Sequence, residues 1–311
     1  MVNPTSQNMM KRLFSYAGIL LCMAVLVVSC SKDDGDGSLG KGNNINANIP
    51  VGNMPQEVTR MEFPHVSNNG TSLILVHRTG DRYDPQGVNY CVEWDYKIMS
   101  QRWSCYQMHA GYRVNGISRY YSDTNQYPRD PELSSHYYLS QDFFYGSGFD
   151  HGHICPSADR LYSVAANTQT FYLTNMQPQY NSFNAGLWAE MENKVRTWTS
   201  TRTSDTLYVC KGGTIDGQVY EGKSGTLQKI RNQLLVPRFF YMALLLKNSM
   251  GYRAMAFWTD QNTNHNTSDL SKYAITIDEL ERRTGIDFFC NLPDDLERQV
   301  ESNLALNSWG L

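Results

Sequence analysis

The sequence predicts an α+β fold with a central, mostly antiparallel sheet flanked by helices. Two observations support this prediction. Strand and helix patterns do not alternate regularly along the chain, as they would in a parallel α/β protein. The 311 residues are 41% hydrophobic and include 12 Phe, 20 Tyr and 6 Trp, which excludes disorder for most of the chain and supplies one large core or two smaller ones.

The elements can be placed in order along the chain. Short runs rich in β-branched and aromatic residues predict strands at 71–77, 87–97, 102–108, 169–174, 206–211, 236–246 and 253–258. A polar break between the second and third runs predicts a hairpin. The polar region 111–150 predicts a long loop that is functional or contains short elements. Helical spacing predicts a helix over 184–199, and a capping box at Thr276 opens another that stops at Gly285.

The N-terminal residues have the pattern of a targeting segment. Lys11 and Arg12 precede the uncharged run 13–28, which is shorter than the roughly 20 residues that a membrane span needs. Cys30 follows the small residue Ser29 at the end of this run, and the arrangement resembles a bacterial lipoprotein box. The resemblance implies cleavage before Cys30 and a diacylglyceryl group on its sulfur. A short membrane anchor with an incidental cysteine is the alternative.

Three segments follow from this pattern. We expect a signal peptide over 1–29, a lipidated cysteine with a flexible Gly-, Asn- and Asp-rich tether over 30–57, and a folded domain over 58–311. The implied location is the cell envelope, lipid-anchored to a bacterial outer membrane on its periplasmic or outer surface. The net charge is 27 − 30 = −3 and becomes 25 − 30 = −5 after residues 1–29 are removed. Binding of nucleic acid by bulk positive charge is therefore excluded, and any such role requires a local site.

Cysteine use fits an oxidising compartment only loosely. Beyond Cys22 and Cys30, the chain has five cysteines, an odd number, and no C-x-x-C pair, which argues against a zinc ribbon or a redox dithiol. These are Cys91, Cys105, Cys155, Cys210 and Cys290. One or two disulfides would fit the compartment, and Cys91 with Cys105, which flank the predicted hairpin, are one candidate pair.

Chemistry-bearing residues are concentrated in two segments. In the first, an extended backbone would place His151 and His153 on one face and Asp150 on the other, with Gly152 allowing close approach. An incidental polar loop and a two-histidine metal site are alternatives, although the metal site lacks a clear third local ligand. In the second, the spacing i, i+4 places a stripe on one helix. Its members are Asn184, Trp188, Glu192 and Arg196. Taken separately, they fit a helix cap and a helical ion pair.

Residues 150–153, Asp-His-Gly-His, resemble the Asp-Arg-Gly-His signature of the DNA/RNA non-specific endonucleases. These are the ββα-metal (His-Me finger) nucleases, a family that includes endonuclease G. The second segment resembles the same family's Asn-x-x-x-Trp-x-x-x-Glu-x-x-x-Arg helix, and 174–179 resembles its lead-in. The resemblance covers roughly residues 71–300 and implies an α+β fold that carries the ββα-metal active-site motif.

The resemblance also implies a role for each matching residue. His153 would be the general base that activates water, and Asn184 would be the one direct protein ligand of Mg²⁺, with Mn²⁺ as a substitute. Glu192 would hold metal-bound water, and Arg196 would face the phosphate. Asp150 would be a structural partner or would support the metal site from outside its direct ligands. This chemistry is physically consistent, because neutral imidazole accepts a proton at neutral pH and Mg²⁺ retains several waters.

The sequence also departs from the family pattern. His151 stands where the family has Arg, so it loses the permanent charge and the two-pronged contact with phosphate. Arg160 is a candidate to compensate, and Arg102 is a second candidate for substrate binding, although its offset from Trp103 differs from the family's. Cys155 is expected to be structural, in a disulfide or otherwise.

Two functions follow. The first is an envelope-anchored, Mg²⁺-dependent endonuclease that hydrolyses DNA and RNA through phosphate and sugar contacts. It would have nucleic acids as substrates and the membrane as a partner, with no obligate protein partner evident. The second is a non-catalytic lipoprotein that binds nucleic acid or glycan on the same scaffold, supported by His151 and the negative charge.

Overall fold

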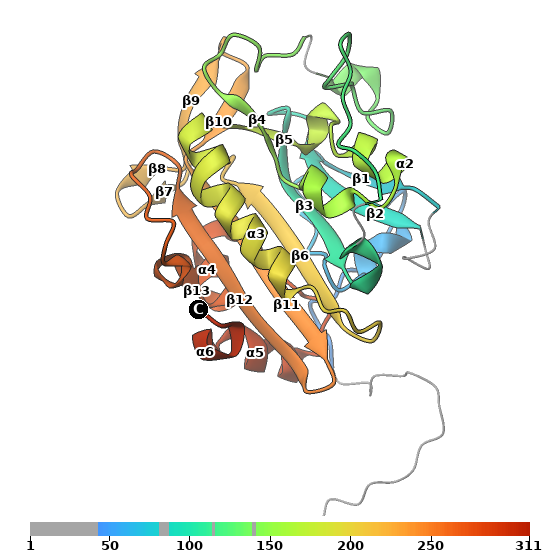
Figure 1. The fold of residues 1–311 in the computed structure, drawn as a ribbon, viewed down its shortest axis with the longest axis vertical. Helices are drawn as coiled ribbons and strands as arrows, with labels where there is room; N and C mark the ends of the chain where they lie inside the picture. The colour runs from blue at the N-terminus through green and yellow to red at the C-terminus, as the bar shows by residue number, and fades with distance from the viewer. Residues whose placement is uncertain (1–42, 81–86, 114–115, 139–140) are drawn as a thin grey trace, which may run out of the picture. The chain divides into compact units, whose positions relative to one another are not determined.

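A computed structural model describes residues 43–80, 87–113, 116–138 and 141–311. The expected signal peptide and Cys30 lie outside these residues. A seven-stranded antiparallel sheet has the order β1-β2-β3-β6-β11-β12-β13 (Figure 1). Its strands are β1 (Ser72–Arg78), β2 (Val88–Asp95), β3 (Ser100–Met108), β6 (Thr206–Gly213), β11 (Phe239–Asn248), β12 (Gly251–Asp260) and β13 (Ala274–Ile275).

Three two-stranded sheets accompany the large one. They pair β4 (Asp150–His153) with β5 (Met176–Gln179), β7 (Val219–Tyr220) with β8 (Lys223–Ser224), and β9 (Thr226–Ile230) with β10 (Leu234–Pro237). The α-helices are α2 (Val164–Gln169), α3 (Ala189–Trp198), α4 (Ile277–Thr284), α5 (Asp294–Glu301) and α6 (Leu306–Trp309). Single 3₁₀ turns are η1 (Gln56–Thr59), η2 (Ala110–Arg113), η3 (Ser135–Tyr137), η4 (Ser157–Arg160), η5 (Leu173–Asn175) and η7 (Leu270–Tyr273), and η6 (Phe183–Trp188) is a π-helical segment.

Helices cover both faces of the large sheet. Alternate side chains of each strand point to opposite faces, so one strand can contribute to the core on both sides. On β11, Phe240 and Met242 belong to the core cluster that contains Met191 and Val195 of α3. Their neighbours on the strand, such as Ala243, belong to a second cluster with residues of α4 and α5. Figure 1 shows α3 in front of the large sheet, running along β6 and β11. The α+β prediction is confirmed.

Most predicted elements are present. The hairpin is β2–β3, and Met99 at its turn has φ of +50°. Thr276 caps α4 by accepting a hydrogen bond from the Glu279 amide at 3.1 Å, and Gly285 ends it with φ of +67°. The region 111–150 contains short 3₁₀ turns and the start of β4. Among the described residues, no helix is both long and apolar enough to cross a membrane.

Two predicted elements differ. The run 169–174 is wrong as a strand, because it holds the end of α2 and a 3₁₀ turn. There Thr170 donates its hydroxyl to the Asn167 carbonyl at 2.7 Å and accepts through its own carbonyl from Asn175 Nδ2 at 2.8 Å, so local contacts replace strand pairing. The predicted helix 184–199 is α-helical only from Ala189.

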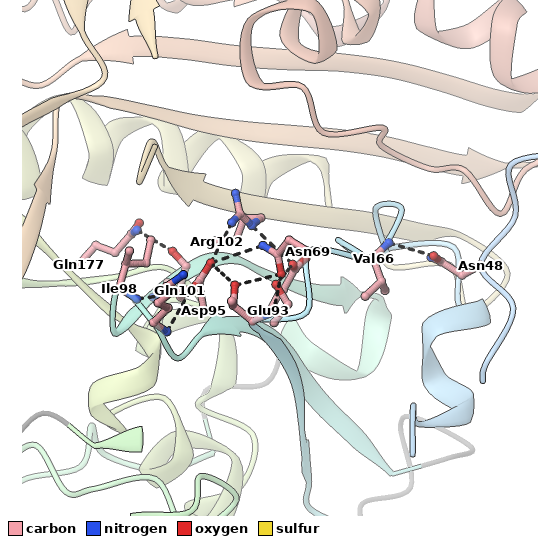
Figure 2. Close-up of polar contacts among 12 residues, drawn as sticks. Asn48, Val66, Asn69, Glu93, Asp95, Ile98, Gln101, Arg102 and Gln177 are labelled. Atoms are coloured by element: carbon pink, nitrogen blue, oxygen red, sulfur yellow. Dashed lines mark hydrogen bonds and ion pairs between the residues drawn. The ribbon is translucent and has the colours of Figure 1, made fainter. Parts of the chain in front are cut away.

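Residues 43–57, the described part of the expected tether, contact the domain. Asn44 donates its side chain to the Leu292 carbonyl at 2.6 Å. Asn48 is buried and donates to the carbonyls of Val58 and Pro64, while its own oxygen accepts from the Val66 amide at 2.9 Å (Figure 2). Asparagine amides satisfy backbone groups here that a flexible tether would leave to water. The part of the expected tether over 43–57 therefore packs on the domain.

Candidate functional site

The site begins with the β4–β5 pair. His153 lies opposite Met176, and Gly152 lies opposite Gln177. A Cβ at Gly152 would lie 2.3 Å from the Gln179 side chain, so only glycine allows this approach. After β5 the chain enters η6 and α3, where the Trp188 indole donates to the His153 carbonyl at 3.2 Å. Two short strands and a helix are thus tied together at His153.

His153 lines a pocket of about 510 Å³. Its Nε2 has no hydrogen-bond partner in the described structure, and the ring stands edge-on to Phe171 with centroids 4.8 Å apart. The His153 ring makes a hydrogen bond with the backbone of His151. Because Nε2 has no partner, Nδ1 makes this bond. Burial, and then the positive charge of Arg119, lower the pKa of His153 to about 3. The imidazole is therefore neutral at pH 7, and its Nε2 keeps a lone pair that no described residue occupies.

Asn184 lines the same pocket from η6. Its Nδ2 donates to Asp150 Oδ2 at 2.9 Å, and Asn181 Nδ2 donates to the same oxygen at 2.9 Å. Gly186 has φ of −105° and ψ of −110°, so the helix is kinked directly after Asn184. Asp150 accepts the hydrogen bond of the Asn184 amide nitrogen. The amide oxygen of Asn184 is therefore available as a ligand for a hard cation.

Glu192 is held in the pocket by a lysine that the sequence analysis missed. Lys211 on β6 is fully buried, and its Nζ lies 3.2 Å from Glu192 Oε1 and 5.4 Å from the Trp188 ring centroid. Burial raises the pKa of Glu192, whereas the positive charge of Lys211 opposes that rise. A lone lysine in a strand gives no sequence signal, because its partner lies on a helix 19 residues earlier.

The pocket contains an arginine and a tyrosine that sequence reasoning also missed. Arg119 and Tyr145 both line it, and Tyr145 is 83% exposed. The Arg119 guanidinium lies 4.8 Å from the Phe171 ring centroid, and burial lowers its pKa. Both residues lie in the region 111–150, which was expected to be functional but offered no motif to identify them.

His151 is stacked between two aromatic rings at the pocket wall. Its ring centroid lies 3.5 Å from that of Tyr127 and 4.4 Å from that of Phe144. Its Nε2 lies 2.9 Å from Asp142 Oδ2, and this contact with His151 lowers the pKa of Asp142 against the opposing effect of burial. The ring is therefore fixed in orientation, unlike a long arginine reaching for phosphate.

The three arginines proposed from sequence do not line the pocket. Arg196 lies on α3 but donates to Asp159 Oδ1 at 2.8 Å and to Asn193 Oδ1 at 2.6 Å. Arg160 is wrong as a substrate-binding residue, because it is 0% exposed and donates to the carbonyls of Asn89, Gln107 and Asp159.

Arg102 is also misplaced as a substrate-binding residue. It lies on β3, where its guanidinium is paired with Asp95 at 3.2 Å and with Glu93 at 3.5 Å (Figure 2). The cavity that it lines shares no residue with the pocket of His153. The carboxylates of β2 therefore hold Arg102 for a structural purpose.

The cysteines are all buried free thiols in the described structure. Cys91 lies directly opposite Cys105, and Cys105 directly opposite Cys210, on three adjacent strands. The candidate Cys91–Cys105 pair is thus adjacent but not joined, and Cys155 is not in a disulfide. Burial raises the pKa of Cys155 to about 12, so this thiol is an unreactive core group.

The chain is similar to several known proteins in sequence and in fold. The family model described as "DNA/RNA non-specific endonuclease" matches residues 83–295. A nuclease of Serratia marcescens is 29% identical over 184 residues, which are 58% of this chain and 66% of that protein. A nuclease of a Nostoc strain is 25% identical over 237 residues, 73% of this chain and 80% of that protein. A crystal structure of an EndoG/EndoGI complex has a similar fold, with a TM-score of 0.57, 23% identity and coverage of 70% of this chain and 86% of that one.

Proposed function

Because this chain belongs to the DNA/RNA non-specific endonuclease family and is a DNA/RNA endonuclease by that membership, we propose that the pocket of His153 is its active site. The observation that carries the proposal is the unpartnered Nε2 of a neutral His153 beside Asn184 in one pocket. A base that is neutral at pH 7 and bears an open lone pair can take a proton from water.

The family implies a metal ion, and the residues of the pocket fit a hard cation. Asn184 would hold it through the amide oxygen that Asp150 leaves available, and Glu192 would hold a coordinated water. Among the described residues, no three acids, histidines or cysteines converge in the pocket, which suits a cation that keeps most of its waters. When bound there, Mg²⁺ or Mn²⁺ would neutralise charge on the phosphate and on the leaving 3′-oxygen.

The residues of the chain then divide the reaction among them. His153 Nε2 takes a proton from a water as the water oxygen bonds to phosphorus and the P–O3′ bond breaks. Arg119 is the pocket's guanidinium and would contact a phosphate oxygen, the role that sequence had given to Arg196. Tyr145, exposed at the wall, can stack on a base without reading its sequence. Phosphate and stacking contacts give cutting of DNA and RNA with little sequence preference.

The test compares wild type, His153→Ala and His136→Ala on supercoiled plasmid and single-stranded RNA, with Mg²⁺ and with EDTA. His136 is an exposed histidine outside the pocket and serves as the control. We expect wild type and His136→Ala to cut both substrates with Mg²⁺ only, and folded His153→Ala to be at least about 10²-fold slower. Intact substrates with retained nucleic-acid binding in wild type would instead support the non-catalytic binding lipoprotein.

The proposed location is the cell envelope, with the chain held by a lipid on Cys30. The support is the sequence pattern of residues 11–30. Metabolic labelling with an alkyne fatty acid should mark the wild-type protein and leave Cys30→Ala unmarked. Equal labelling of the two would refute the anchor without bearing on the nuclease pocket.

A further inference from the structure

A second cluster of acids lies at the helices α4 and α5. These helices contribute to the core on the face of the sheet opposite α3. A cavity of about 390 Å³ here shares no residue with the pocket of His153. Six carboxylates and one guanidinium line it, and they belong to Asp278, Glu281, Asp287, Asp294, Glu297, Glu301 and Arg298.

No ion pair neutralises the six carboxylates of this cavity within the described ranges of the chain. Arg298 is paired instead with Asp295, which does not line the cavity. Glu301 is 95% buried and its Oε1 has no hydrogen-bond partner. A buried carboxylate beside other carboxylates is unfavourable in its charged form and gains stability from a cation bound among them.

The geometry suits a hard cation. Asp278, Glu281 and Glu301 each offer an oxygen, and these oxygens lie within 4.8 Å of one another. Mg²⁺ demands near-ideal octahedral geometry and keeps several waters, whereas Ca²⁺ accepts irregular sets of carboxylate oxygens such as this one, which come from two helices. Ligands made only of oxygen exclude soft metals. We propose that Asp278, Glu281 and Glu301 bind a calcium ion on the face of the sheet opposite the nuclease pocket.

The site would also fasten the N-terminal segment to the domain. Asn46 donates its amide to Asp287 at 3.1 Å and to Glu297 at 3.0 Å, and the Ile45 amide donates to Asp294 at 3.0 Å. A calcium ion lowers the repulsion among the carboxylates that these groups contact. Occupation of the site therefore strengthens the attachment of residues 45–46.

The test measures Ca²⁺ binding by isothermal titration calorimetry on the full chain in detergent, in the Asn184→Ala background so that the nuclease pocket does not contribute. Glu281→Gln and Glu301→Gln remove one carboxylate each, and Asp295→Asn is the matched control on α5. We expect one Ca²⁺ site in Asn184→Ala, unchanged by Asp295→Asn and weakened at least about tenfold by either Gln substitution. Hydrogen exchange at the Ile45 amide should slow with Ca²⁺ only where the site is intact.

The two Gln variants are isosteric and reduce repulsion, so they should fold. In EDTA they should melt at or above the temperature of the parent, but without its rise on addition of Ca²⁺. In the otherwise wild-type chain both should keep Mg²⁺-dependent cutting, which separates this proposal from the nuclease site. Absence of Ca²⁺ binding in Asn184→Ala, or binding that neither Gln substitution weakens, would overturn the proposal.

Discussion

Asp150 holds Asn184 in place, with its Oδ2 accepting the Asn184 amide at 2.9 Å. The acid of the Asp-His-Gly-His segment therefore acts on the helix that follows β5, and it determines which end of the Asn184 amide faces the pocket. The sequence alone predicts that Asp150 belongs to the site but does not specify its partner.

Asp150→Ala should weaken the response to Mg²⁺ while leaving His153 intact. Loss of a partner that orients a metal ligand typically costs 10–100-fold in affinity, so we expect half-maximal activity to need at least about tenfold more Mg²⁺. Asn181→Ala is the control, because Asn181 donates to the same oxygen but does not line the pocket. Titrating Mg²⁺ in a plasmid-nicking assay measures both, and an equal shift in the two variants would contradict the assignment.

The pH profile should report the unusual state of His153. In the unfolded chain histidine titrates near 6.5, whereas burial lowers the pKa of folded His153 to about 3. The base therefore stays neutral as the pH falls from about 7 to 5, and kcat/KM should show no loss with a midpoint near 6.5. Stability should decline over that range, because only the unfolded state gains the proton. Initial rates on RNA and urea unfolding from pH 4 to 8 test both, and an acid limb centred near 6.5 would refute the first.

Lys211→Met should affect both stability and the pH at which the enzyme works. Removing the buried ammonium 3.2 Å from Glu192 leaves that carboxylate without its nearest cation and costs about 3 kcal/mol. The pKa of Glu192, already raised by burial, should rise further, so activity should be lost at neutral pH and recover as the pH increases. Urea denaturation and a pH–rate profile provide the measurement. Addition of Glu192→Gln should restore stability but not activity, and a double variant as unstable as Lys211→Met would argue against the pair.

Substitutions of Arg160 and Arg119 should have different effects, the first on stability and the second on substrate binding. Arg160 is fully buried and lies 4.7 Å from the Tyr106 ring centroid, so Arg160→Met should lower the free energy of unfolding by about 3 kcal/mol and leave the KM of the folded fraction unchanged. Arg119→Ala should have the opposite profile, with a higher KM and little change in stability, since its side chain lines the pocket. Denaturation curves and steady-state kinetics on both variants decide. A KM effect confined to Arg160→Met would reverse our assignment.

Local patterns account for what the sequence predicted well. The hairpin, the capped helix and every predicted strand except 169–174 depend on periodicity and turn chemistry, and the structure contains them. The site depends on contacts between distant residues, which local patterns do not report. Spacing suggested that Glu192 and Arg196 could pair along the helix, yet tertiary contacts give Glu192 to Lys211 and Arg196 to Asp159. Likewise, Arg160 carries a guanidinium group of the kind that binds phosphate, but the structure buries this side chain in the core.

The hydrogen bond from Asn44 to Leu292 would limit how far the folded domain can lie from a membrane. If Cys30 carries the lipid, as proposed, only residues 31–44 separate the membrane surface from the first docked side chain. That stretch spans at most about 50 Å when fully extended. The proposed pocket would then stay within a thin layer next to the bilayer, where it would encounter long polymers that cross this layer more often than fragments diffusing beyond it.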